Sequence, residues 1–154
     1  MDIKNEDMKI VSQLRKNSRE SLTKISRSTN IPVSTIFDKL KNKTNSVIKK
    51  HTCIIDFPKI GMTTRVKMIL KVLPDDREPV RDFLKKSCNL NSLYKINNGY
   101  DYFADMVFRS LKELEEFLEK LDDNYRIKTR MIFYVIEELE CERYLSGSEI
   151  DCMQ

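Results

Sequence analysis

The polar side chains of one short stretch are the best placed in this chain to recognise another molecule. Residues 32–43 read PVSTIFDKLKNK, and the hydrophobic Ile36 and Leu40 lie four residues apart. In a helix these two residues share an inward face, and the remaining positions point outward. The outward face then carries hydroxyl, carboxylate and ammonium groups. Such groups hydrogen-bond to the edges of DNA bases and pair with phosphates.

Each residue type on this face suits a particular partner on DNA. Ser34 and Thr35 can donate or accept hydrogen bonds, and Asp38 can accept one from cytosine N4. Lys41 can reach guanine or a phosphate, and the other lysines suit phosphates, which position a protein without specifying sequence. The candidate DNA contacts are Ser34, Thr35, Asp38, Lys39, Lys41, Lys43, Lys49 and Lys50. The alternative for each of them is an ordinary solvated surface.

Two short helices with a tight break between them are predicted to position this face, within residues 23–43. Asn30 in the break tolerates the left-handed backbone conformation, and Pro32 fits the first turn of the second helix. Ser18 or Ser21 can cap the first of the two helices. A short polar helix followed by a helix with a basic surface is the helix-turn-helix pattern.

Flanking segments complete a small domain around these helices. A further helix is predicted over Asn5–Lys16, and helices this short must bury one shared apolar centre. Its expected members are Ile10, Val11, Leu14, Ile25, Ile36 and Leu40. Residues 47–55 are rich in β-branched residues and are predicted to form a strand, either a wing that brings Lys49 and Lys50 near phosphates or a plain edge strand. Phe37 is expected to pack against this wing, with a thymine methyl as its alternative contact.

Pro58 and Gly61 mark the predicted boundary between two domains, residues 1–60 and residues 61–154. Residues 1–60 contain 13 Lys and Arg against 6 Asp and Glu, whereas residues 61–154 contain 15 against 18. A basic first domain and a mildly acidic second domain indicate a polyanionic partner for the first domain alone.

The second domain alternates between strand and helix patterns. Strands are predicted at residues 64–72, 90–97, 101–108 and 127–139, and helices at about 79–87 and from 111 onward. Asn98-Gly99 is a strong hairpin signal, and Ser110 with Glu113 matches a capping box that opens the last helix. The order βαββαβ is that of a ferredoxin-like domain, so the expected fold class is α+β.

One face of the predicted sheet is left without helices. On the last strand, Ile132, Tyr134 and Ile136 are expected to point to this uncovered face, opposite a core set that includes Met131 and Phe133. An exposed apolar patch usually marks an interface. We therefore expect a homodimer that packs sheet against sheet, the alternative being a monomer with an open face.

Composition excludes several other classes of protein. The chain is 40% hydrophobic and 34% charged, and its apolar runs are far shorter than a membrane span. The first ten residues, MDIKNEDMKI, do not resemble a secretory signal. The cysteines, at positions 53, 88, 141 and 152, form no C-x-x-C pair, and the single histidine, His51, belongs to no catalytic motif. We expect a cytoplasmic protein that is not an enzyme and has no metal site or cofactor.

The ordered set of motifs resembles the Lrp/AsnC family of feast/famine transcriptional regulators over nearly the whole chain. Residues 7–14 resemble the family's opening helix, residues 25–40 its helix-turn-helix, and residues 47–49 with Gly61 its wing and linker. Gly99-Tyr100-Asp101, followed by residues 114–118, is similar to the hairpin and helix of the family's effector domain. The resemblance implies a DNA-binding regulator that acts as a homodimer or a higher oligomer such as an octamer.

Some positions depart from the family pattern. Asn30 and Ser46 stand where the family often has glycine, and residues 122–125 lack the glycine that commonly precedes the last strand. The resemblance implies an amino-acid effector bound near the hairpin and the last strand. The positions carried over for that site are Gly99, Asp101 and Thr129.

Two other functions remain open at this point. The second domain can act as a metabolite sensor through protein partners, with the basic domain serving only solubility. Some enzymes that resemble this family process tetrapyrroles on the same scaffold, but they need basic side chains in the second domain's cleft, and His51 lies outside that domain.

Overall fold

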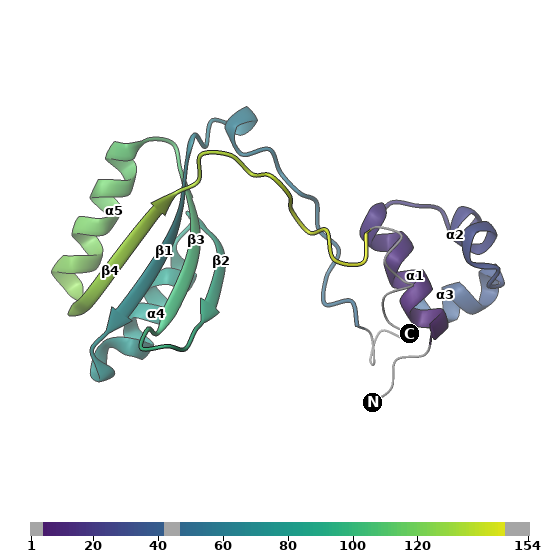
Figure 1. The fold of residues 1–154 in the computed structure, drawn as a ribbon, viewed down its shortest axis with the longest axis horizontal. Coiled ribbons are helices and arrows are strands. Elements are labelled where there is room, and N and C mark those ends of the chain that lie inside the picture. Colours follow the sequence, from purple (N-terminus) through teal and green to yellow (C-terminus); the bar gives the residue numbers. More distant parts are fainter. Residues whose placement is uncertain (1–4, 42–46, 147–154) are drawn as a thin grey trace. The chain divides into compact units, whose positions relative to one another are not determined.

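The computed structural model describes residues 5–41 and 47–146 of the chain (Figure 1). Contacts divide the chain into two compact units. One contains residues up to Ile54 together with those from Leu139 onward, and the other is Ile55–Glu138. The chain therefore passes between the units twice, at residues 54–55 and again at residues 138–139, whereas the sequence predicted one boundary near residue 60.

The first unit contains the three predicted helices, α1 (Asn5–Lys16), α2 (Leu22–Thr29) and α3 (Val33–Lys41). Ser21 caps α2, since its side chain accepts a hydrogen bond from the backbone N–H of Lys24 at 3.3 Å. Asn30 ends α2 in the left-handed conformation with φ 58°, and its N–H donates to the Ser26 carbonyl. The predicted break between the two helices is thereby confirmed.

Four isoleucines form the buried centre of this unit, Ile10, Ile25, Ile31 and Ile36, with Leu14, Leu22 and Leu40 packed around them. Ile31 lies in the turn between α2 and α3, which is why helical spacing did not identify it. Val11 was expected in this centre, but it is only half-buried and lies outside the cluster.

The segment after the last strand also belongs to the first unit. Arg15 of α1 donates to the carbonyls of Glu142 and Tyr144, both at 3.1 Å, and pairs with the Glu142 carboxylate at 2.6 Å. Leu145 is 8% exposed. Residues 141–146 do not form a helix. Glu142 and Leu145 adopt φ of 54° and 63°, and left-handed residues at both positions interrupt a helix.

The predicted wing strand is not formed. Residues 47–56 contain no strand, although β-branched residues there favour extended backbone. A strand also needs a hydrogen-bonded neighbour, and none of the four described strands pairs with this segment.

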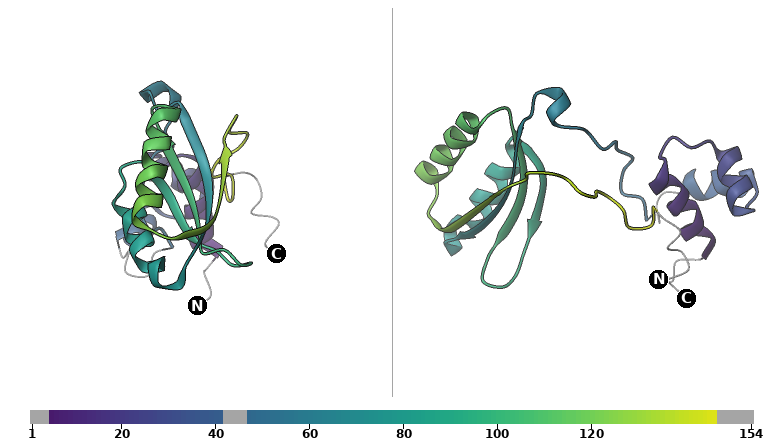
Figure 2. Two further views of the ribbon diagram at one scale, coloured as in Figure 1. Left: turned by 90° about the vertical axis from the view of Figure 1, so that its left-hand side faces the viewer. Right: turned by 45° about the horizontal axis from the view of Figure 1, so that its top comes forward.

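The second unit is a four-stranded antiparallel sheet with two helices on one face (Figures 1 and 2). The strand order is β2-β3-β1-β4, as the ferredoxin-like prediction requires. The elements are β1 (Thr64–Val72), α4 (Arg77–Lys86), β2 (Leu90–Lys95), β3 (Tyr102–Phe108), α5 (Leu111–Asn124) and β4 (Ile127–Tyr134), with short 3₁₀ turns at Pro58–Ile60 and Pro74–Asp76.

Local signals place the connections of this unit as predicted. Asn98 and Gly99 have φ of 57° and 86°, and the Tyr100 N–H donates to the Asn97 carbonyl, so the β2–β3 hairpin closes on a type I′ turn. Ser110 accepts from the N–H of Glu113, and the Glu113 carboxylate accepts from the N–H of Arg109 at 2.7 Å. Both hydrogen bonds anchor the start of α5.

The faces of β4 are opposite to those predicted. Ile132 pairs with Met68 and packs against the helix-covered core, whereas Met131 and Phe133 lie on the uncovered face. The cause is an irregularity at Lys128, because Ile127 pairs with Val72 while Thr129 pairs with Lys71. A one-residue bulge reverses the side of every later residue. The strand also ends at Tyr134, so Ile136, which is 99% exposed, lies beyond it.

Replacing Asn30 with valine should destabilise the first unit, because a β-branched residue at φ 58° is strained. We expect a loss of about 1–2 kcal/mol in the free energy of unfolding. Asn30→Gly is the matched control and should retain stability. Chemical denaturation followed by the helical circular dichroism signal measures both, and equal stability of the two variants would contradict the left-handed turn.

Candidate nucleic-acid interface

The outer face of α3, formed by Val33, Ser34, Phe37, Asp38 and Lys41, is exposed along its whole length. The side chains of Ser34 and Asp38 have no hydrogen-bonding partner among the described residues. The Lys41 ammonium lies 5.8 Å from the centre of the Phe37 ring, and Thr35 beside this face is half-buried. Four of the predicted contacts, Ser34, Thr35, Asp38 and Lys41, are therefore brought together on or beside one helix surface.

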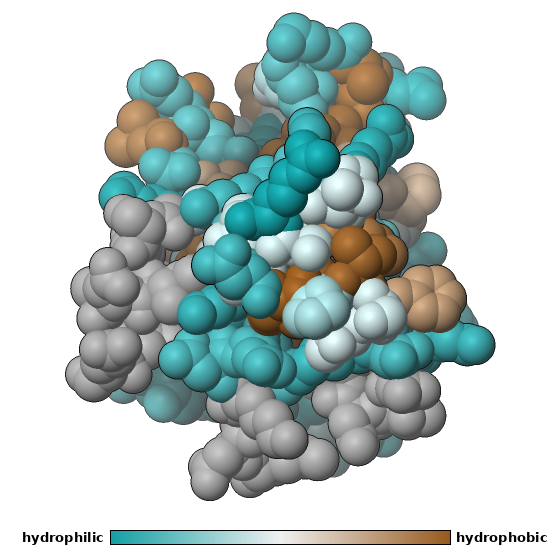
Figure 3. Space-filling view, turned by 90° about the vertical axis from the view of Figure 1, so that its right-hand side faces the viewer, coloured by the Kyte–Doolittle hydropathy of each residue, from teal (hydrophilic) through white to brown (hydrophobic). Residues whose placement is uncertain are grey.

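Hydrophobic side chains also occupy this face. Val33 is 41% exposed and Phe37 is 51% exposed, so the expected packing of Phe37 against a wing is not seen in the described residues. The space-filling view in Figure 3 shows hydrophobic side chains grouped among a larger hydrophilic surface. The outer face of α3 can thus offer apolar contacts as well as hydrogen bonds.

Lys39 has a different environment from the other predicted contacts. Its ammonium lies 2.7 Å from Asp7 and 3.3 Å from Glu6, both on α1. The hydrogen bond to Asp7 is the main cause that raises the pKa of Lys39. Lys39 therefore links α3 to α1, a role that the spacing of residues within α3 could not reveal because its partners are more than thirty positions away.

The remaining basic candidates lie after α3. Lys49 and Lys50 are exposed on the segment that was predicted to be a strand, and Lys43 lies outside the described residues. His51 is exposed beside them. The first unit thus offers free ammonium groups in addition to the outer face of α3.

Proteins similar to this chain are HTH-type transcriptional regulators. A scan against models of protein families found no match. LrpC of Bacillus subtilis is 23% identical over 132 residues, which are 85% of this chain and 92% of LrpC. The uncharacterized regulator PF1231 of Pyrococcus furiosus is 31% identical over 118 residues, which are 73% of this chain and 76% of that protein.

Solved structures share this fold over most of the chain. The structure of B. subtilis LrpC matches with a TM-score of 0.80 at 20% identity, over 91% of this chain and 99% of that chain. The structure of E. coli AsnC matches with a TM-score of 0.78 at 15% identity, over 92% and 97%. The chain belongs to the Lrp/AsnC family of transcriptional regulators. The predicted family, the α+β fold class and the function as an HTH-type regulator are confirmed.

In this Lrp/AsnC regulator, the predicted effector residues have unequal surroundings. Gly99 is exposed in the turn of the hairpin. Asp101 is only 7% exposed, and its carboxylate accepts from the Val72 N–H at 2.9 Å and pairs with Arg77 at 2.9 Å. Thr129 is exposed on β4 opposite Lys71, whose ammonium lies 3.7 Å from Asp101. Lys71 therefore lies between Thr129 and Asp101. The Asp101 carboxylate, however, is already bound by the Val72 N–H and by Arg77.

The uncovered sheet face has a charged centre with apolar side chains around it. Asp105 is 3% exposed and lies 2.8 Å from Arg65, 2.7 Å from Lys67 and 2.8 Å from the Asn91 amide. Burial raises the pKa of Asp105, but these three hydrogen bonds outweigh it and lower the pKa below its usual value. The apolar neighbours on this open face are Ile69, Phe103, Met131 and Phe133.

Other sites can be examined in the described parts of the chain. Within residues 5–41 and 47–146, no three His, Cys, Asp or Glu side chains gather into a metal-binding group. Cys53 and Cys88 are free thiols. None of the described helices combines the length and hydrophobicity needed to cross a membrane.

Proposed function

We propose that this regulator reads double-stranded DNA with the outer face of α3 in the major groove. The observation that carries the proposal is the exposed row of Ser34, Asp38 and Lys41 on the second helix of a helix-turn-helix. Thr35 lies at the edge of this row and contributes a further hydroxyl. Lys49 and Lys50, together with Lys43, supply phosphate contacts in this proposal. Lys39 is left out, because it would have to release Asp7 and Glu6 to reach DNA.

The proposed DNA-binding form is a homodimer joined through the open face of the sheet. Phe133 is 52% exposed there, and Ile69, Phe103 and Met131 lie on the same face of the sheet, which is a composition typical of an interface. A two-fold axis would present two copies of α3 to half-sites about 10 bp apart. Further association of dimers, up to an octamer, is part of the same proposal.

An amino acid is the proposed effector. One solved structure of this fold, NMB0573 from Neisseria meningitidis, is an L-Met complex, with a TM-score of 0.82 at 14% identity. Gly99, Thr129 and Asp101 are the proposed positions near the ligand, with Asp101 acting through Arg77 and Lys71 because its carboxylate is engaged. The protein is proposed to act in the cytoplasm as a regulator without enzymatic activity, in keeping with relatives that are transcriptional regulators.

Replacing Lys49 and Lys50 with alanine should weaken binding to all DNA sequences alike. Log affinity falls with log salt with a slope of about −0.9 for each phosphate contact. The slope of the double variant should therefore be less steep by about 2. Fluorescence anisotropy over a salt series on full-length protein measures this. Lys112→Ala, a change at an exposed lysine of α5, is the control. An unchanged slope in the double variant would remove Lys49 and Lys50 from the interface, and a flat slope in the unmodified protein would favour a sensor that acts through protein partners.

Phe37 should recognise a thymine methyl group. After selection of a preferred operator from random DNA, each thymine is replaced by uracil, which removes only the methyl. The unmodified protein should lose affinity about fourfold at one position, because burying one methyl contributes about 0.8 kcal/mol. Phe37→Ala should bind both operators equally. Uracil in the flanking sequence is the control, and a Phe37→Ala protein that still discriminates thymine from uracil would contradict the contact.

Phe133→Glu should convert the dimer to a monomer by placing a charge within the open face. Tyr134→Glu is a closely matched control, since Tyr134 is the next residue, is also 52% exposed, and pairs with Val66 on the helix-covered side. Sedimentation equilibrium measures the mass of each variant. Dissociation by Tyr134→Glu alone would show that the other side of β4 makes the interface.

A further inference from the structure

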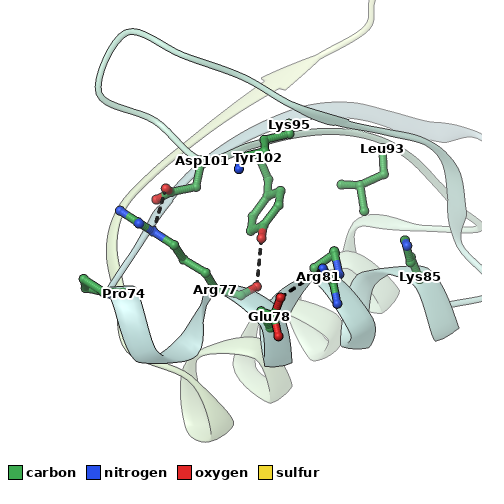
Figure 4. A pocket seen from close by; sticks show the side chains of 9 residues that line it. All are labelled: Pro74, Arg77, Glu78, Arg81, Lys85, Leu93, Lys95, Asp101 and Tyr102. Carbon is green, nitrogen blue, oxygen red and sulfur yellow. Dashed lines mark hydrogen bonds and ion pairs between the residues drawn. The ribbon is translucent and has the colours of Figure 1, made fainter.

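The second unit contains a cavity between α4 and the β2–β3 edge of the sheet (Figure 4). Its volume is about 380 Å³, within the range of small-molecule sites. It is lined by Pro74, Arg77, Glu78, Arg81, Lys85, Leu93, Lys95, Asp101 and Tyr102. We propose that this cavity binds a small organic anion through a carboxylate or phosphate group. This site goes beyond the proposed DNA and amino-acid binding. Asp101 and Arg77 belong to both proposed sites, but neither Gly99 nor Thr129 lines this cavity.

A row of cations on α4 carries the proposal. Arg77, Arg81 and Lys85 follow one another at intervals of four, so they share one face of the helix, and Lys95 of β2 lines the same cavity (Figure 4). Like charges at this spacing destabilise a helix by mutual repulsion. A bound anion would relieve that repulsion and gain several charge-assisted hydrogen bonds.

Acidic side chains neutralise only one end of the row. Arg77 pairs with the buried Asp101 at 2.9 Å, and Arg81 pairs with Glu78 at 3.4 Å and with Asp82 at 3.0 Å. Lys85 and Lys95 have no ion-pair partner among the described residues. The uncompensated positive charge therefore belongs to Lys85 and Lys95, which line the cavity from different elements. Lys85 is in the last turn of α4, and Lys95 is at the end of β2 beside Tyr102, so the anionic group is expected between them (Figure 4).

The opposite wall suits the body of an organic molecule rather than an inorganic ion alone. Leu93 is half-buried there, and the Tyr102 ring is held in place by its hydroxyl, which donates to the Arg77 carbonyl at 2.9 Å. Tyr102 is 7% exposed, so most of its side chain is packed into the fold. An apolar wall facing a group of ammonium and guanidinium donors matches a metabolite with an anionic head and a short hydrocarbon body.

Isothermal titration calorimetry of the full-length protein with succinate and with inorganic phosphate tests this site. We expect saturable binding of at least one probe, and the arm that binds distinguishes a carboxylate from a phosphate ligand. The double change Lys85→Gln and Lys95→Gln should weaken binding by at least about tenfold. Lys86→Gln is the matched control, because Lys86 is exposed on the same helix but does not line the cavity.

Three results would overturn the proposal. One is the absence of saturable binding by both probes, and another is an equal loss of affinity in Lys86→Gln, which would indicate a general effect of charge. The third is a smaller salt slope for DNA binding in the double variant, which would make Lys85 and Lys95 phosphate-backbone contacts. Unchanged thermal unfolding of the variants is required throughout. A protein that binds DNA normally but binds neither probe would contradict the anion site and would leave the proposed DNA-binding function unaffected.

Discussion

Three helices of 12, 8 and 9 residues cannot persist alone, and this constraint governs the DNA-binding unit. They are stable only while Ile10, Ile25, Ile31 and Ile36 exclude water together. Because the inward residues of α3 pack into this shared core, the packing determines the orientation of α3 relative to α2. The polar and apolar side chains on its outer face are then free to serve recognition. Ion pairs between Lys39 and α1 reinforce the same orientation from outside the core.

A different constraint applies to the second unit, because its sheet has two faces and helices cover only one of them. The covered face buries Val66, Met68, Leu70 and Val72 of β1 against α4 and α5. On the other face, Asp105 remains ionised among Arg65, Lys67 and Asn91, and apolar residues surround this cluster. A satisfied buried charge within an apolar surface gives an interface its register as well as its affinity. This combination suits a surface that must pair with one specific copy.

Long periodic segments and strong local signals could be predicted from the sequence. The limits of α1, the left-handed Asn30, the Asn98-Gly99 turn and the cap of α5 all depend on residues within a few positions of one another. Features that depend on distant partners could not be predicted. The candidate wing found no strand to pair with, and the acids that hold Lys39 come from another helix. The bulge at Lys128 reversed the faces of β4, because strict alternation carries no signal for one extra residue.

Because the chain returns to the first unit after the sheet, residues up to Ile54 do not make up that unit alone. Arg15 on α1 is satisfied by Glu142 and Tyr144, which follow the effector domain in sequence. A chimaera that exchanged only the amino-terminal residues between relatives would separate this arginine from its acceptors. Exchange of this unit between relatives would therefore require the segment that holds Glu142 and Tyr144 to be exchanged with the helices, so these two parts of the sequence should change together.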